Sequence, residues 1–169
     1  CDWASVGAFA TYSFTKQDLR KDPLGRAAGV APVGEPYLED GSINPYPFGD
    51  GTIINPIIDE GPGVWKNERI TKRYFNSAYL NFNITEDLNF KTSFSADLKD
   101  RNEGKWADYY TLERAGSAKG SNYASVEHLS FTNLLLENLL SFNKDINSHS
   151  FQFVLGNEVN WTKTEHYFN

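Results

Sequence analysis

Few residues in this chain have the types and the spacing that catalysis or metal binding requires. The three histidines, His128, His149 and His166, are widely separated, and none belongs to a zinc-ligand motif or an obvious nucleophile pair. Asp40-Gly41 and Asp50-Gly51 are typical of turns, because the alternating acidic ligands of a calcium loop are absent. We therefore expect no metal site and no cofactor, and we expect that the protein is not an enzyme.

Four aromatic residues in predicted loops are the candidate ligand-binding side chains, namely Trp65, Trp106, Tyr109 and Tyr110. Flat rings offer sugars or peptides an apolar surface at a low entropic cost. The same rings could instead pack the loops against their neighbours or form an aromatic belt at a membrane edge. The packing alternative is the stronger expectation, because long ordered loops need small cores of their own.

The elements that must position these residues are β-strands. Two successive runs, 74–85 and 88–99, alternate apolar and polar side chains, and a period of two fits extended strands and not helices. Only Glu86 and Asp87 separate the runs, so together they predict one long hairpin with a short turn. Each run reaches the roughly 9 to 11 residues that a tilted strand needs to cross a bilayer.

Three further runs, 3–15, 130–143 and 149–162, also alternate, although the leucines of 130–143 would equally fit a helical stripe. Residues 144–148 are typical of a turn, so two long connections, 16–73 and 100–129, alternate with short turns. Outer-membrane barrels combine short periplasmic turns with long extracellular loops in this way, whereas compact soluble domains rarely hold such long structureless loops. The fold class predicted is all-β, with about five antiparallel strands of a partial transmembrane β-barrel.

The alternation assigns each side chain of the predicted strands either to the barrel lumen or to the lipid. Seven strand residues are predicted to face the lumen, namely Asn81, Asn83, Lys91, Ser93, Asp97, Gln152 and Glu158. The opposite face is predicted to contact lipid through Leu80, Phe82, Ile84, Leu88, Phe90 and Phe94. Five strands cannot close a transmembrane barrel, for which about eight are needed. An open edge in hydrocarbon would leave backbone groups unpaired, so other strands or chains must complete the wall.

Composition narrows the possible partners and locations. The 169 residues carry a net charge of −6 without a basic block, which argues against a nucleic-acid partner. The mean hydropathy is −0.52 and no apolar run is long enough for a transmembrane helix. Cys1 is the single cysteine and cannot form an internal disulfide. It is expected to mark a chain break or a cloning remnant, with an acylated lipoprotein terminus as the alternative.

A series of short motifs follows in a fixed order along the chain: Leu24-Gly25-Arg26-Ala27, Ala31-Pro32, Glu35-Pro36-Tyr37, Asp40-Gly41-Ser42, Asn55-Pro56, Glu137-Asn138-Leu139-Leu140-Ser141-Phe142, and His149 followed by Gly156 and Glu158. In these motifs and their order the chain resembles the SusC/RagA-like TonB-dependent outer-membrane transporters of Bacteroidetes. The spacing of Ala78, Leu80, Ile84, Leu88 and Phe90-Lys91 is also similar to the strand-turn-strand unit of the family.

The resemblance implies a mid-barrel section of a protein with about 22 strands. It also implies energised import of glycans, oligosaccharides or peptides across the bacterial outer membrane. The implied partners are the remainder of the barrel and its plug, a SusD-like surface lipoprotein, the TonB complex and outer-membrane lipid. Neither a plug nor a TonB-engaging segment fits within this chain. The rival hypothesis is a secreted, soluble β-sandwich that binds carbohydrate through Trp106, Tyr109 and Tyr110.

Overall fold

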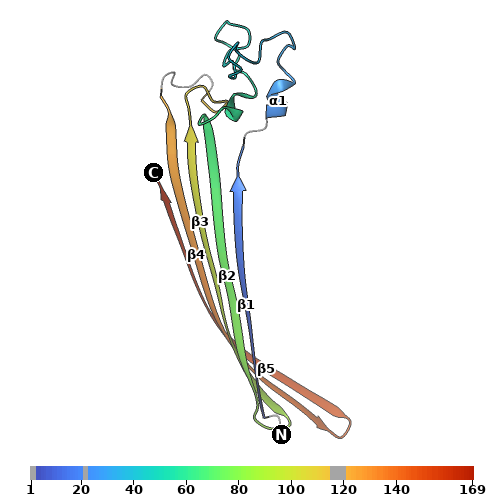
Figure 1. Cartoon of the computed structure of the whole chain (residues 1–169). Helices are drawn as coiled ribbons and strands as arrows, with labels where there is room; N and C mark the ends of the chain where they lie inside the picture. Colours follow the sequence, from blue (N-terminus) through green and yellow to red (C-terminus); the bar gives the residue numbers. More distant parts are fainter. Residues whose placement is uncertain (1–2, 21–22, 115–120) are drawn as a thin grey trace. The chain divides into compact units, whose positions relative to one another are not determined.

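The computed structural model describes residues 3–20, 23–114 and 121–169, and these residues form one open antiparallel sheet (Figure 1). Its strands follow one another in the order β1 (Ala4–Asp18), β2 (Trp65–Asn83), β3 (Leu88–Ala107), β4 (Tyr123–Ile146) and β5 (His149–Phe168). Strands β1 and β5 are not neighbours, so each has one partner within the described chain. The prediction of an all-β fold with five antiparallel strands is confirmed. Cys1 lies outside the described residues.

Two short helical turns interrupt the connection between β1 and β2, namely α1 (Pro23–Ala27) and the 3-10 turn η1 (Ile58–Glu60). Among the described residues, no helix has the length and apolar character to span a membrane. The described residues fall into two compact units. The first unit contains 3–14, 71–101 and 129–166, and the second contains the remaining described residues. The short turns belong to the first unit and the long connections to the second.

The strands are longer than the sequence predicts, and the loop boundaries must be corrected. Strand β2 begins at Trp65 and not at 74, while β3 continues to Ala107 and not to 99. The connections are therefore 19–64 and 108–122 in place of 16–73 and 100–129. The added segments were missed because charged residues replace the apolar alternation. Opposite charges hold them in register instead, as between Arg69 and Glu103 at 2.8 Å.

The hairpin of β2 and β3 keeps its register through side-chain pairs that lie equally far from Glu86. Asn89 donates a hydrogen bond to Asn83 at 2.8 Å, and Ser95 donates one to Ser77 at 3.0 Å. The turn covers 84–87 and is longer than the Glu86-Asp87 turn predicted. The Thr85 hydroxyl accepts the backbone N–H groups of Asp87 and Leu88, at 3.3 and 3.0 Å, which draws this end of the run out of the strand.

The second hairpin turn is shorter than predicted. Strand β4 ends at Ile146 and β5 begins at His149, so the turn is Asn147-Ser148 rather than 144–148. Asn147 has a φ of 54°, in the left-handed region that asparagine tolerates better than most residues. This conformation reverses the chain within two residues, and the flanking residues remain in the strands.

Buried side chains occur in only one of the two units. The buried apolar residues are Ile58, Ala107 and Leu112, all from the second unit. Among its described residues, the first unit has no buried side chain at all. Large apolar side chains such as Phe94 and Leu155 are 47% and 59% exposed there. Among the described residues, the sheet of the first unit therefore has no core on either face.

Candidate functional site

The predicted lumen-facing residues of the first unit lie on a common polar face. The hydrogen bond between Asn83 and Asn89 places both side chains on one side of the hairpin. On the same side, the Arg73 guanidinium donates two hydrogen bonds of 2.7 Å to the two carboxylate oxygens of Asp97. Asn81 follows the same alternation in β2. The bidentate pair uses both carboxylate oxygens, so Asp97 serves to hold β3 beside β2.

The polar face continues onto the last two strands. The Asn133 amide donates to Asn160 Oδ1 at 2.7 Å and to Thr162 Oγ1 at 2.8 Å. Ser93 Oγ donates to Glu137 Oε2 at 3.2 Å, which joins β3 to β4. Side chains of alternating positions on β2, β3, β4 and β5 therefore form a network of neutral and charged hydrogen bonds across one surface.

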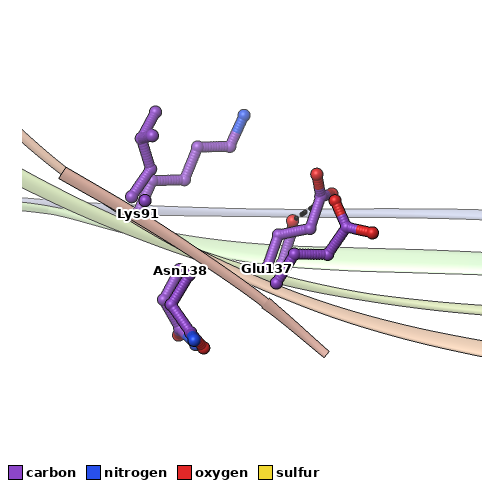
Figure 2. A pocket seen from close by; sticks show the side chains of 8 residues that line it. Lys91, Glu137 and Asn138 are labelled. Atoms are coloured by element: carbon purple, nitrogen blue, oxygen red, sulfur yellow. Dashed lines mark hydrogen bonds between the residues drawn. The ribbon is translucent and has the colours of Figure 1, made fainter. Parts of the chain in front are cut away.

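An open hollow of about 340 Å³ lies in the polar face around Gly156, which contributes no side chain to fill it. Two of the predicted lumen residues, Lys91 and Glu158, meet there with Ser93 and Glu137. The Lys91 ammonium lies 5.0 Å from the centre of the Tyr79 ring, a cation–π distance. Figure 2 shows Lys91 and Glu137 on one side of the strand and Asn138 on the other.

This polar surface can hydrate and hydrogen-bond a passing solute, but the described residues contain no cluster of three or more groups able to hold a metal ion. A second hollow, of about 330 Å³, lies near Arg73, Asp97 and Lys99 and is also lined by Phe131. The first hollow contains the charged side chains Lys91, Glu137 and Glu158, and the second contains the Arg73–Asp97 ion pair beside the apolar side chain of Phe131.

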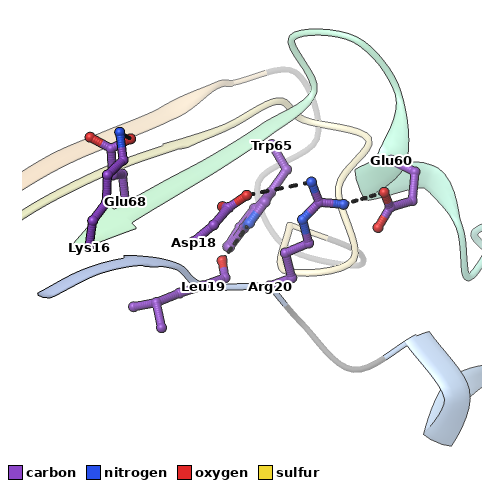
Figure 3. A network of polar contacts seen from close by, with 7 residues as sticks. All are labelled: Lys16, Asp18, Leu19, Arg20, Glu60, Trp65 and Glu68. Carbon is purple, nitrogen blue, oxygen red and sulfur yellow. Dashed lines mark hydrogen bonds and ion pairs between the residues drawn. The ribbon is translucent and has the colours of Figure 1, made fainter. Parts of the chain in front are cut away.

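Trp65 belongs to the second unit and is the first residue of β2, not a loop residue as predicted. Its indole Nε1 donates to the backbone oxygen of Leu19 at 3.0 Å, and the Lys105 ammonium lies 5.2 Å from its ring centre. Figure 3 shows this bond beside the ion pair of Lys16 with Glu68, at 2.7 Å. Trp65 is therefore engaged in holding the strand ends together.

Arg20 completes the same network where the chain leaves β1. Its guanidinium pairs with Asp18 at 3.5 Å and with Glu60, which belongs to η1 (Figure 3). The hydrogen bond to Glu60 raises the pKa of Arg20 above its ordinary value. The network anchors the 19–64 connection at both of its ends, through Arg20 and through Trp65.

The other three predicted aromatics contact the 19–64 connection or one another, and Trp106 is a strand residue of β3 and not a loop residue as predicted. Trp106, near the end of β3, donates its indole N–H to the Gly63 backbone oxygen at 2.9 Å. The Tyr109 and Tyr110 rings lie 3.9 Å apart, and Tyr46 meets Tyr110 edge-on at 6.0 Å. A hydrogen bond to Tyr110 raises the pKa of Tyr109 to about 12.

Trp106 and Tyr109 remain accessible, with 38% and 39% of their surface exposed. The geometry thus gives all four candidate aromatics a packing role and leaves these two with a free surface as well. Tyr46 was missed by the sequence reasoning, because its place between Pro45 and Pro47 resembles an ordinary loop. Its aromatic type within a long loop was the only signal available.

The 19–64 connection has a hydrogen-bonded framework of its own around the buried Asn55. The Asn55 amide donates to the backbone oxygens of Pro36 and Asn44, both at 2.9 Å. The expected turns are confirmed, because Asp40 accepts the backbone N–H of Ser42 and Asp50 accepts that of Thr52. Hydrogen bonds from the hydroxyl and the backbone N–H of Ser42 lower the pKa of Asp40, and hydrogen bonds from the backbone N–H and the hydroxyl of Thr52 lower the pKa of Asp50.

Comparison with known proteins gives one informative similarity. No protein-family model matches the chain. The chain is similar to the TonB-dependent receptor P3 of Formosa agariphila, with 30% identity over 135 residues. The aligned part makes up 80% of this chain and 13% of that receptor, so the chain spans a small part of the length of this relative.

Proposed function

We propose that the chain is a section of the wall of a TonB-dependent nutrient transporter in the bacterial outer membrane. The observation that carries the proposal is the sheet of the first unit, which has one largely apolar and one largely polar face and no buried residue among those described. The similarity to a TonB-dependent receptor supports the same protein family.

The exposed apolar face is the physical reason for placing the sheet in a membrane. Tyr12, Phe94 and Trp161 are 54%, 47% and 50% exposed on their strands, an arrangement that lipid would stabilise and water would not. The outer edges of β1 and β5 have no partner strand in the described chain. Further strands that close a barrel would pair the backbone groups of both edges.

In this proposal the polar face lines the lumen and performs no chemistry, so the protein is a transporter and not an enzyme. Asn81, Asn83, Lys91, Asp97 and Glu158 are the lumen-facing residues of this section. The cargo is a glycan, oligosaccharide or peptide, delivered with the help of a SusD-like surface lipoprotein, as the SusC/RagA-like motifs imply. The TonB complex supplies the energy through a part of the transporter beyond this section.

The soluble β-sandwich is not proposed, because a sandwich needs two sheets packed face to face. The described residues supply one sheet, whose apolar face has no second layer upon it.

The experiment that distinguishes the membrane-embedded wall from a soluble sandwich is fractionation of cells that produce the protein. We expect it in the outer-membrane fraction, extracted by detergent and not by salt. A monodisperse monomer that stays soluble without detergent would overturn the proposal.

Ligand binding by the exposed aromatics is tested separately. Tyr109→Ala in the transporter should weaken the affinity for the imported ligand about fivefold, because one ring contact contributes roughly 1 kcal/mol. Trp106→Phe keeps an aromatic surface and should weaken the affinity less. Tyr37→Ala is the matched control, because Tyr37 is an exposed aromatic of the 19–64 connection outside the cluster. Unchanged affinity in Tyr109→Ala would refute the role of these aromatics in binding. The proposal that the chain is a section of a transporter wall would still stand.

A further inference from the structure

One row of side chains crosses the polar face of the first unit through the second hollow, the one of about 330 Å³. It takes one residue from each of the strands β2 to β5, namely Arg73, Lys99, Phe131 and Thr164. The interstrand bonds of the polar face fix this register, because positions equally far from a bonded pair of antiparallel strands are themselves opposed. The four side chains therefore line one hollow side by side.

Lys99 supplies a positive charge that the hollow does not neutralise. Two like charges directly opposite each other destabilise a sheet, and the register opposes Arg73 to Lys99. Arg73 turns instead to Asp97, whose two carboxylate oxygens each accept a hydrogen bond of 2.7 Å from it. Lys99 is half-buried, and apart from the effect of its charge on Asp97 it has no hydrogen bond or ion pair within residues 3–20, 23–114 and 121–169. The three ionised side chains therefore leave the hollow with one net positive charge.

The next two members of the row add an apolar surface and a hydroxyl group. Phe131 is half-buried beside Leu129, and Thr164 is exposed. Neighbouring strands lie about 4.8 Å apart, so the positions of Lys99, Phe131 and Thr164 span about 10 Å of the polar face. A sugar ring presents the matching set, because it has an apolar face for an aromatic ring and hydroxyl groups for hydrogen bonds.

We propose that the hollow is a binding subsite for an acidic sugar, that is, a sugar unit that carries a carboxylate or a sulfate group. Lys99 binds the anionic group, and a charge-assisted hydrogen bond of this kind is roughly twice as strong as a neutral one. Phe131 packs against the apolar face of the sugar, and Thr164 bonds to one of its hydroxyl groups. The subsite rests on the proposed function, which places the hollow in the lumen that the cargo crosses.

The charge and the strand pairing of the hollow decide between the possible cargoes. A neutral sugar would leave the ammonium of Lys99 without an anion. A peptide is commonly bound through its backbone at a free strand edge, whereas β3 and β4 each have a partner strand on both sides. The first hollow holds one lysine and two glutamates, so its net charge is negative and it offers an anionic group no such contact. The preference for an acidic sugar is therefore local to the Lys99 row.

The test is the binding of defined oligosaccharides to the purified transporter in detergent, measured by isothermal titration calorimetry. The probes are an oligogalacturonate and a sulfated oligogalactose, with neutral oligogalactose as the uncharged counterpart. We expect an acidic probe to bind, and we expect Lys99→Gln to weaken its affinity about tenfold with little effect on the neutral probe. Lys99→Arg keeps the charge and should retain most of the affinity. Lys72→Gln is the matched control, because it removes the same charge from the position beside Arg73 but on the opposite face of β2, and it should bind as the parent does.

A second variant tests the ring. Phe131→Leu keeps an apolar side chain but removes the flat surface, and it should weaken the binding of the acidic probe about fivefold. The subsite is refuted if neither acidic probe binds more tightly than the neutral one, or if Lys99→Gln leaves the affinity unchanged. An oligoglutamate that binds through Lys99 more tightly than both acidic sugars would replace the sugar with a peptide. Absence of the transporter from the outer membrane would refute the proposed function itself, whereas a membrane-embedded transporter without a Lys99-dependent affinity would refute only the subsite.

Discussion

Gly7 of β1 lies beneath the ring of Tyr79, so replacing it by alanine should displace that ring. A Cβ atom at Gly7 would lie 2.3 Å from Cε1, 2.6 Å from Cζ and 2.8 Å from Oη of Tyr79. Contacts this short are not tolerated, so the ring must rotate away. The ring would also lose the Lys91 ammonium, which lies 5.0 Å from its centre.

The expected cost follows from the contacts that the ring gives up. Leaving its rotamer costs roughly 0.5 to 1.5 kcal/mol, and the exposed cation–π contact contributes about 0.5 to 1 kcal/mol. Alanine recovers about 0.5 to 1 kcal/mol, because glycine is unfavourable within a strand. Gly7→Ala should therefore lower the free energy of unfolding by about 1 kcal/mol. In a Tyr79→Ala background the same substitution should raise it by about 0.5 to 1 kcal/mol.

The assay is guanidinium unfolding of the transporter in phospholipid bilayers, followed by tryptophan fluorescence. Gly104→Ala is the matched control, because it is also a strand glycine and a Cβ there meets no atom within 4 Å. It should be neutral or stabilising in both backgrounds. If Gly7→Ala has the same effect with and without Tyr79, the ring does not limit this position and the reasoning is refuted.

Three further predictions concern the connections. Asn55→Ala should lower the stability of the 19–64 connection by about 2 to 4 kcal/mol, because two backbone oxygens lose their buried donor. Limited proteolysis should then cut the chain within 19–64. An unchanged digest would contradict this prediction. Trp106→Phe removes the 2.9 Å bond to Gly63 and should cost about 1 kcal/mol, seen as faster amide exchange in the same connection. The raised pKa of Tyr109 means that its contribution to stability is complete below pH 10.0 and is lost as the pH rises through about 12. Tyr109→Phe should remove that late step from an ultraviolet titration, and its persistence would assign the step elsewhere.

The sequence predicts the strands where side chains alternate between apolar and polar, and this is why the 74–99 hairpin was found. The same alternation underestimates the length of strands in which both faces are polar. The segment 65–73 has no apolar period, and its pairing becomes visible only when Arg69 is set against Glu103 at equal distance from Glu86. Charge complementarity about a turn would have been the signal, and it requires the turn to be placed correctly first.

The candidate site was predictable by residue type but not by arrangement. Aromatic type alone singled out Trp65, Trp106, Tyr109 and Tyr110, yet the packing of Tyr46 on Tyr110 depends on two segments that are far apart along the chain. No local pattern encodes such a meeting. Likewise, the bonds of Asn133 to Asn160 and Thr162 depend on the register of β4 and β5, because a shift by one residue would send one side of the contact to the other face.

The order β1-β2-β3-β4-β5 has a consequence for how such a wall changes over evolutionary time. Every strand pairs only with the strands that precede and follow it along the chain. A duplication or deletion of one hairpin therefore adds or removes two strands at once. All other strand pairs remain as they were. Walls of different circumference can arise from one ancestral gene by copying a hairpin, without any change to the strands already present.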